Sequence, residues 1–175
     1  MTDNVRYPTG RFQFDPDVTP AKRRASIDAI RQTPSALRAA VRGLSAAQLD
    51  TPYRPAGWTV RQVVHHVPES HMNAFVRFKL ALTEDNPTIK TYNEDAWVKL
   101  KDVAKVPVET SLALLDALHE RWVALLETMQ DADFARPLQH PEYGLMTLDK
   151  MLQMYAWHGR HHVAHVTALR SREGW

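Results

Sequence analysis

Four segments of this chain repeat their apolar residues at the spacing of an α-helix, and no segment alternates apolar and polar residues as a half-buried strand does. The segments cover residues 19–44, 59–82, 107–129 and 147–171. Amphipathic helices bury such stripes by packing against one another, so the pattern predicts an all-α four-helix bundle. Thr19, Thr59 and Thr147 stand where each can act as an N-cap.

Two prolines interrupt these predicted helices. Pro34 removes a backbone hydrogen bond from the first one, which predicts a kink or break near Thr33. Pro68 predicts a bend in the second helix, just after a histidine pair. Neither proline alters the number of helices expected.

The remaining segments read as connections within a single domain that spans residues 1–175. Residues 1–18 hold spaced aromatics and turn dipeptides, and predict an extended arm lying over the body. Residues 83–107 are polar and predict a long crossover connection with one short helix at 94–101. Residues 130–146 predict a loop, in which His140 is a loop histidine.

The composition excludes several functional classes. The chain contains no cysteine, so disulfides, thiolate metal sites and a cysteine nucleophile are ruled out. Its 22 basic residues are interspersed with 20 acidic ones, which indicates a solvated surface of mixed sign rather than a nucleic-acid interface. No apolar run approaches the roughly 20 residues of a membrane span and no signal peptide is recognisable, so we expect a cytoplasmic protein.

The last predicted helix carries four of the nine histidines within residues 151–166. His158 and His162 form one i,i+4 pair, and His161 and His165 form another, so either pair can converge on one metal ion. On a helical wheel the apolar face is centred about 70° from His158, with His162 at about 40° and the other two on the far side. The inner pair, His158 and His162, is therefore the preferred candidate and the outer pair the reserve.

An open catalytic zinc site usually has three protein ligands, so the second helix should supply the third. His71 lies on the apolar stripe of that helix, His66 at its edge and His65 on the other flank. The wheel alone does not choose between them. His119 in the third helix reads as a boundary residue.

Separated motifs of the sequence resemble the DinB/YfiT-like superfamily of metal-dependent hydrolases, whose close relatives include bacillithiol S-transferases. The motifs are GWTVRQVVHHVPESHMNAFVRFKLALTEDNP, with LDTPYRP upstream and YAWHGRHHVAHVTAL downstream. The resemblance implies a four-helix bundle that often dimerises, here a homodimer. It also implies metal ligands at His66, eight residues after Trp58, and at His158 and His162. Pro68 departs from the family's usual small helix former.

A three-histidine site would leave a divalent ion with its full charge and an open position, able to activate water or a thiol. The expected function is therefore a metal-dependent hydrolase or a low-molecular-weight thiol S-transferase acting on a small molecule. Zinc is the first expectation, and nickel and manganese also fit. Glu69, Gln62 and Tyr155 lie within helical reach of the ligands, but no general base is assigned. The alternative is a non-catalytic helical module that the metal only stabilises.

Overall fold

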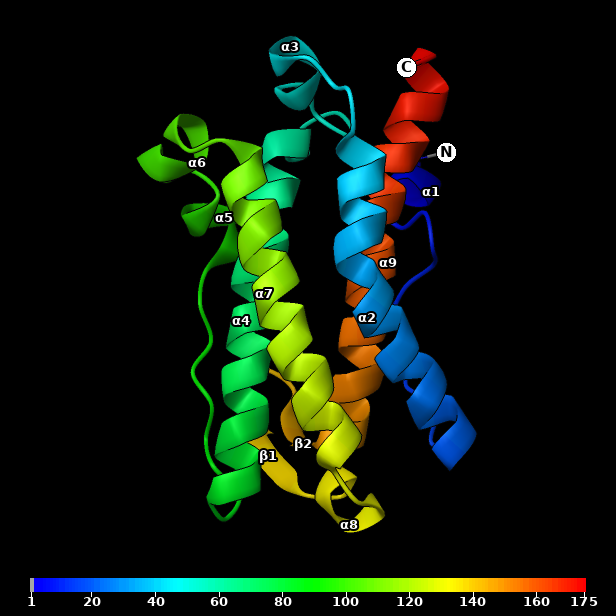
Figure 1. The fold of residues 1–175 in the computed structure, drawn as a ribbon, viewed down its shortest axis with the longest axis vertical. Coiled ribbons are helices and arrows are strands. Elements are labelled where there is room, and N and C mark those ends of the chain that lie inside the picture. Colours follow the sequence, from blue (N-terminus) through cyan, green and yellow to red (C-terminus); the bar gives the residue numbers. More distant parts are fainter. Residues whose placement is uncertain (1) are drawn as a thin grey trace.

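The computed structural model describes residues 2–175, and four long helices form its frame (Figure 1). They are α2 (Pro20–Val41), α4 (Val60–Thr83), α7 (Val108–Thr128) and α9 (Leu148–Glu173). Helix α2 packs against α7 and α9, and α4 packs against the same two helices, so the four surround a common core. The predicted all-α four-helix bundle is confirmed.

Threonine caps set the starts of three of these helices at the predicted positions. The side chains of Thr19, Thr59 and Thr147 each accept a hydrogen bond from the backbone N–H three residues further on. Thr59 also forms a capping box with Gln62. At the other end of α9, Gly174 takes a left-handed conformation with φ of 73°, which stops the helix.

The connection after α4 is the predicted crossover, and it makes α4 and α7 run in the same direction (Figure 1). Within it lie α5 (Glu94–Trp97) and α6 (Lys101–Lys105), where a single short helix at 94–101 was predicted. The helix is split because Val98 is buried and its carbonyl accepts a hydrogen bond from the Gln62 side chain. A contact with α4 thus overrides the local helical preference.

The N-terminal arm is helical at its beginning. Helix α1 (Thr2–Arg6) precedes the first proline, so nothing in that stretch prevents a helical turn, and the turn packs on α9. Residues 7–19 then follow the predicted extended course along α9, where Gly10 accepts a hydrogen bond from the Trp157 indole at 3.0 Å. The prediction of an extended arm over residues 1–18 was therefore wrong for residues 2–6, and Met1 lies outside the described residues.

The segment before α9 contains structure where only a loop was predicted. It forms α8 (Asp131–Phe134) and an antiparallel hairpin of β1 (Pro137–His140) and β2 (Gly144–Thr147). Leu138 and Met146 pair across the hairpin and are both buried. His140 thus lies on a strand. With four residues per strand, the alternation is too short to stand out in the sequence.

The prolines within the helices do not break them. Helix α2 continues through Pro34, and its ribbon changes direction midway, so the predicted break near Thr33 is absent while a bend is present (Figure 1). Helix α4 likewise continues through Pro68. Surrounding helices supply enough packing to hold the residues on either side in helical geometry.

The apolar interior divides into two clusters along the bundle axis. One holds Ile30, Phe78, Trp122 and Leu152 with their neighbours, and the other holds Leu37, Val64, Leu115 and Val166 with theirs. His71 on α4, His119 on α7 and the four histidines of α9 lie in sequence between the residues of the two clusters, and His66 lies at the edge of the second cluster. The bundle therefore contains a histidine layer at mid-height between two apolar layers.

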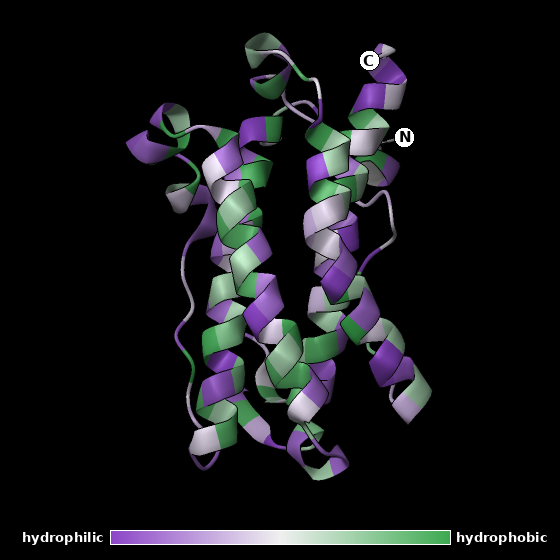
Figure 2. Ribbon diagram, in the orientation of Figure 1, coloured by the Kyte–Doolittle hydropathy of each residue, from purple (hydrophilic) through white to green (hydrophobic). Residues whose placement is uncertain are grey.

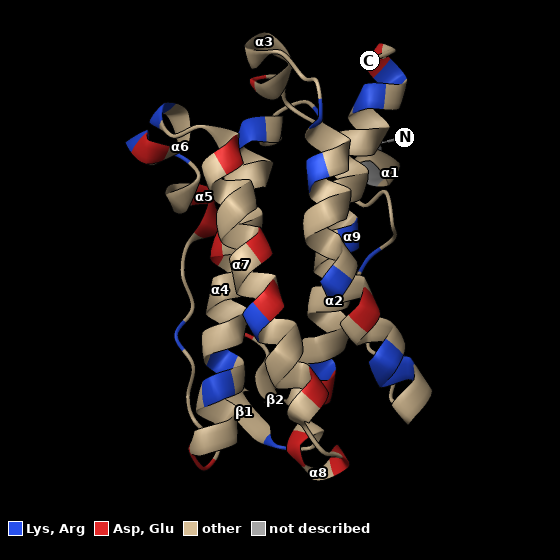
Figure 3. Ribbon diagram, viewed as in Figure 1, with Lys and Arg blue, Asp and Glu red and all other residues tan. Residues whose placement is uncertain are grey.

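Hydrophilic residues alternate with hydrophobic ones around each long helix, as expected for amphipathic packing (Figure 2). Charges of both signs are scattered along the visible face rather than gathered by sign, in agreement with the mixed-sign surface predicted above (Figure 3). Among the described residues, no helix is long and apolar enough to cross a membrane.

Gly159 allows α9 to approach α2 closely at the histidine layer. A Cβ atom placed on Gly159 would lie 2.8 Å from Cγ2 of Thr33 and closer still to its hydroxyl oxygen. The adjacent residue in α9 is His158, so this close approach fixes the position of a candidate ligand relative to α2.

We predict that Gly159→Ala lowers the free energy of unfolding by about 1–3 kcal/mol, because overpacking outweighs the gain in helix propensity. Chemical denaturation measures the change. Thr33→Ala removes the obstructing atoms, so the double variant should be more stable than the sum of the two single effects predicts. A Gly159→Ala protein as stable as the wild type would contradict this account of the interface.

Candidate metal centre

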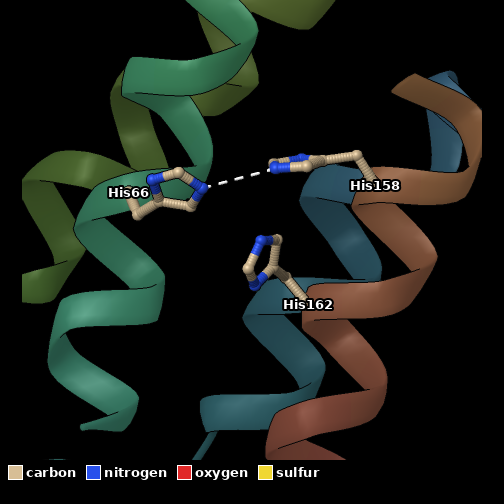
Figure 4. A group of neighbouring side chains, drawn as sticks. All are labelled: His66, His158 and His162. Carbon is tan, nitrogen blue, oxygen red and sulfur yellow. Dashed lines mark hydrogen bonds between the residues drawn. The ribbon is translucent and has the colours of Figure 1, made fainter. Parts of the chain in front are cut away.

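The structure brings His66 of α4 together with His158 and His162 of α9 (Figure 4). One ring nitrogen from each residue lies within 4.8 Å of the others, and no other described group of histidines or carboxylates gathers in this way. The i,i+4 spacing on α9 places two rings on one side of that helix, and α4 faces them. These are the three residues predicted as ligands.

The distance between two of the three rings suits a tetrahedral ion. The Nε2 atoms of His66 and His158 are 3.3 Å apart. Two nitrogens that bind one zinc ion at roughly 2.0–2.1 Å in tetrahedral geometry are separated by about 3.3–3.4 Å. The chemistry of the donor set also fits, because three neutral imidazoles are typical ligands of a catalytic divalent metal.

Burial keeps these imidazoles neutral, which is the form that binds a metal. It lowers the pKa of His66 to about 4, only slightly opposed by the charge of Asp95. Burial lowers the pKa of His158 and His162 well below the ordinary value as well, and neighbouring histidines add to the effect. Nδ1 of both His66 and His162 is buried without a hydrogen-bond partner among the described residues.

A cavity of about 620 Å³ opens onto the cluster, and all three histidines contribute to its wall. Trp58 lines the cavity beside them, with its ring centroid 4.6 Å from that of His66, and its indole N–H donates to Asp95. The wall also includes the polar side chains of Ser70, Arg77 and Tyr92. Sequence analysis did not identify these lining residues, because they come from α4 and from the connections on either side of it and carry no local motif.

The outer histidine pair of α9, His161 and His165, contacts the N-terminal arm and the loop that contains Tyr53. Nε2 of His165 donates to the carbonyl of Arg6 at 3.0 Å, and its ring stacks on Tyr53 at 3.9 Å between centroids. His161 stacks on Trp157 and lies 3.4 Å from the Thr9 hydroxyl. Neither residue belongs to the cluster of three, so the structure separates the inner pair from the reserve pair.

The other histidines considered in the sequence occupy different positions. His65 is buried and its Nδ1 lies 2.7 Å from the Ser111 hydroxyl, on the α7 side of α4. His71 and His119 are buried in the histidine layer, so the interpretation of His119 as a boundary residue was wrong. The available signal was its place on the apolar stripe of α7, between Leu115 and Trp122.

Of the three residues within helical reach of the ligands, one contributes to the cavity wall. Tyr155 lines the cavity, and burial raises the pKa of its phenol, so it stays protonated. Gln62 is occupied by the Thr59 cap and by the Val98 carbonyl. Glu69 is absent from the cavity lining, although burial raises the pKa of its carboxyl group. Neither Gln62 nor Glu69 is placed to act as a base in the cavity.

The fold and the cluster together define a class of protein: four-helix bundles with three converging histidines in their interior. The chain belongs to the DinB superfamily, whose model matches residues 29–166. The predicted family is thereby confirmed.

Curated relatives and solved structures agree with this assignment. A protein of Bacillus mycoides (strain KBAB4) named "Putative metal-dependent hydrolase" is 51% identical over 98% of this chain and 99% of its own length. A protein of the same name from Bacillus cereus (strain B4264) is 50% identical over 99% of each chain.

Among solved structures, YfiT from Bacillus subtilis, described as "a probable metal-dependent hydrolase with an unusual four-helix bundle topology", is 46% identical, with a TM-score of 0.95 over 98% of this chain and 99% of its own. TT2238, described as a four-helix bundle protein, is 20% identical with a TM-score of 0.59 over 85% of this chain and 98% of its own, and supports the fold alone.

We predict that the metal-free protein loses stability as the pH falls below about 6.5. Burial lowers the pKa of His66 and of His119 to about 4 in the folded state, whereas both rings take up protons near pH 6.5 when unfolded. The unfolded state then binds more protons, so the free energy of unfolding falls by about 1.4 kcal/mol per pH unit for each such histidine.

Urea denaturation at pH 7, 6 and 5 of chelator-treated protein measures this slope. His119→Gln removes one titrating ring and should make the slope shallower by roughly one proton. A free energy of unfolding that stays constant over this range would contradict the burial of neutral histidines.

Proposed function

We propose that this protein is a metal-dependent enzyme in which His66, His158 and His162 hold a divalent ion and a small-molecule substrate enters the adjoining cavity. The observation that carries the proposal is the convergence of the three ring nitrogens within 4.8 Å of one another at the wall of a cavity of about 620 Å³. The names of the relatives support the hydrolase class in particular. Zinc is the preferred ion, and nickel and manganese suit the same nitrogen ligands.

A bound divalent ion would supply Lewis-acid polarisation and lower the pKa of a water or thiol that joins it. The protein's own contribution is to keep the three imidazoles neutral by burial and to exclude bulk water. Trp58 covers one side of the His66 ring. It also stacks parallel to the His162 ring, with 6.2 Å between the centroids of the Trp58 and His162 rings. A partly apolar wall of this kind strengthens electrostatic interactions within the cavity.

The polar wall of the cavity can orient a substrate. Ser70, Tyr92 and Tyr155 line the cavity, and burial raises the pKa of both phenols, so they remain donors at neutral pH. Arg77 is 7% exposed and donates to the Lys90 carbonyl, which fixes its charge beside the two tyrosines. Hydroxyl groups and a held cation of this kind favour a substrate with a polar or anionic group.

The hydrogen bonds of the histidines outside the cluster favour an enzyme over a non-catalytic module that the metal only stabilises. A structural site would require a fourth protein ligand, such as His71 or His165. His165 is engaged with the Arg6 carbonyl, and Nε2 of His71 lies 3.0 Å from Nδ1 of His158, on the far side of that ring from the cluster. The cluster faces the cavity instead, which leaves a position for water or substrate.

Hydrolysis and transfer of a low-molecular-weight thiol are two candidate reactions for the same centre. The hydrolase reading is supported by the names of the relatives. Thiol transfer is supported by the three neutral imidazoles, which leave a divalent ion with its full charge, so that the ion can deprotonate a thiol that binds to it. A thiol, with an ordinary pKa near 8.5, needs much less assistance to lose its proton than water does.

We predict that elemental analysis of protein purified without chelators finds about one divalent ion per chain. His162→Ala should lose the ion, since a ligand is removed and the affinity falls by more than the roughly 10–100-fold typical of outer partners. His161→Ala is the matched control, because it removes the adjacent histidine of α9 that lies outside the cluster. An empty wild-type protein, or equal loss in both variants, would overturn the three-histidine assignment.

The two reactions are separated by assays on the zinc-loaded protein. Hydrolysis predicts turnover of an activated aryl ester in water alone, whereas thiol transfer predicts turnover of an aryl chloride only when a thiol such as cysteine is added. In either case His162→Ala should lose the activity and His161→Ala should retain more of it. Ion binding without turnover in both assays would favour the non-catalytic module.

A further inference from the structure

Two buried histidines outside the cluster connect His158 to the opposite side of the bundle. Nδ1 of His158 lies 3.0 Å from Nε2 of His71, and Nδ1 of His71 lies 2.8 Å from Nε2 of His119. Nδ1 of His119 then lies 2.7 Å from the backbone carbonyl oxygen of Ile30. His71 has no exposed surface and His119 is 2% exposed. We call His158, His71, His119 and the Ile30 carbonyl the histidine chain.

The carbonyl of Ile30 fixes the direction of every hydrogen bond in the histidine chain. A carbonyl oxygen only accepts, so Nδ1 of His119 must carry the proton. A neutral imidazole has one N–H, so Nε2 of His119 is an acceptor and accepts a hydrogen bond from Nδ1–H of His71. By the same step Nε2 of His71 accepts from Nδ1–H of His158. Burial, which lowers the pKa of both His71 and His119, supports the neutral form required here.

The end of the histidine chain is the candidate metal ligand. With its proton on Nδ1, His158 presents the lone pair of Nε2 toward Nε2 of His66, 3.3 Å away. The other two cluster members have no such support, since Nδ1 of His66 and of His162 has no hydrogen-bond partner among the described residues. His158 is therefore the ligand whose tautomer and ring orientation are set before any ion arrives.

We infer that His71 and His119 are positioning residues, which fix the tautomer of His158 so that its Nε2 is available to the metal; this inference rests on the proposed function. Metal-binding histidines usually donate their second N–H directly to a carboxylate, a carbonyl or water. Here two neutral imidazoles extend that link to a carbonyl on another helix. Each helix of the bundle supplies one member: His158 is on α9, His71 on α4, His119 on α7 and Ile30 on α2.

The affinity of the protein for zinc tests the inference through substitutions at His119. His119→Leu keeps the volume but leaves Nδ1–H of His71 without an acceptor, so the affinity should fall by about 10–100-fold. His119→Gln can donate to the Ile30 carbonyl and accept from His71, and should restore most of the affinity. His65→Leu is the control, because it replaces a buried histidine of α4 that hydrogen-bonds Ser111 instead. Competition with a chromophoric chelator measures all four proteins.

The tautomers provide a second readout that does not depend on metal or on activity. Long-range ¹H–¹⁵N correlation spectra of the metal-free wild type should show His158, His71 and His119 all protonated at Nδ1, and His119→Leu should change the His158 signal. His158 protonated at Nε2 in the wild type, or zinc affinity equal in His119→Leu and wild type, would overturn the inference. A wild type that binds no zinc overturns the proposed function instead, and the spectra of the metal-free wild type still decide the tautomer.

Discussion

The cost of burying imidazoles away from water is the constraint on which this structure depends. A buried polar ring without a partner is destabilising by a few kcal/mol, and a charged one by more. The bundle places a layer of histidines between two apolar clusters, so those rings must be neutral and must find partners within the layer. The histidine chain satisfies three of them, and the cluster leaves nitrogens that an ion would satisfy.

The topology follows from the same requirement. The crossover makes α4 and α7 parallel neighbours, which lets His71 and His119 face each other at equivalent depth in the bundle. On the other side, Gly159 lets α9 approach α2 at the residue after His158. A larger residue there would move His158 away from its partners. The long connection and the small residue are thus both geometric conditions for one hydrogen-bonded layer.

The sequence predicts some residues of the site but not others. The wheel singled out His158 and His162, the pair that the structure brings together with His66, because the direction of a side chain depends only on its own helix. It did not choose among His65, His66 and His71, since that choice depends on where α9 lies relative to α4, and the family resemblance supplied His66. The hydrogen bond between His71 and His119 joins residues 48 positions apart, and only the packing of two helices reveals it.

The four histidines of α9 divide into two pairs with different partners. This division separates the shape of the cavity from the positions of the cluster nitrogens. The inner pair, His158 and His162, belongs to the cluster, whereas His161 and His165 contact the arm that carries Phe12 and Phe14 to the cavity wall. A change in the arm therefore alters the shape of the cavity while the cluster nitrogens stay where the bundle holds them. The cavity wall is therefore built partly by a loop-like arm, whereas the cluster is built by helices of the bundle, so the shape of the cavity can change without displacement of the cluster nitrogens.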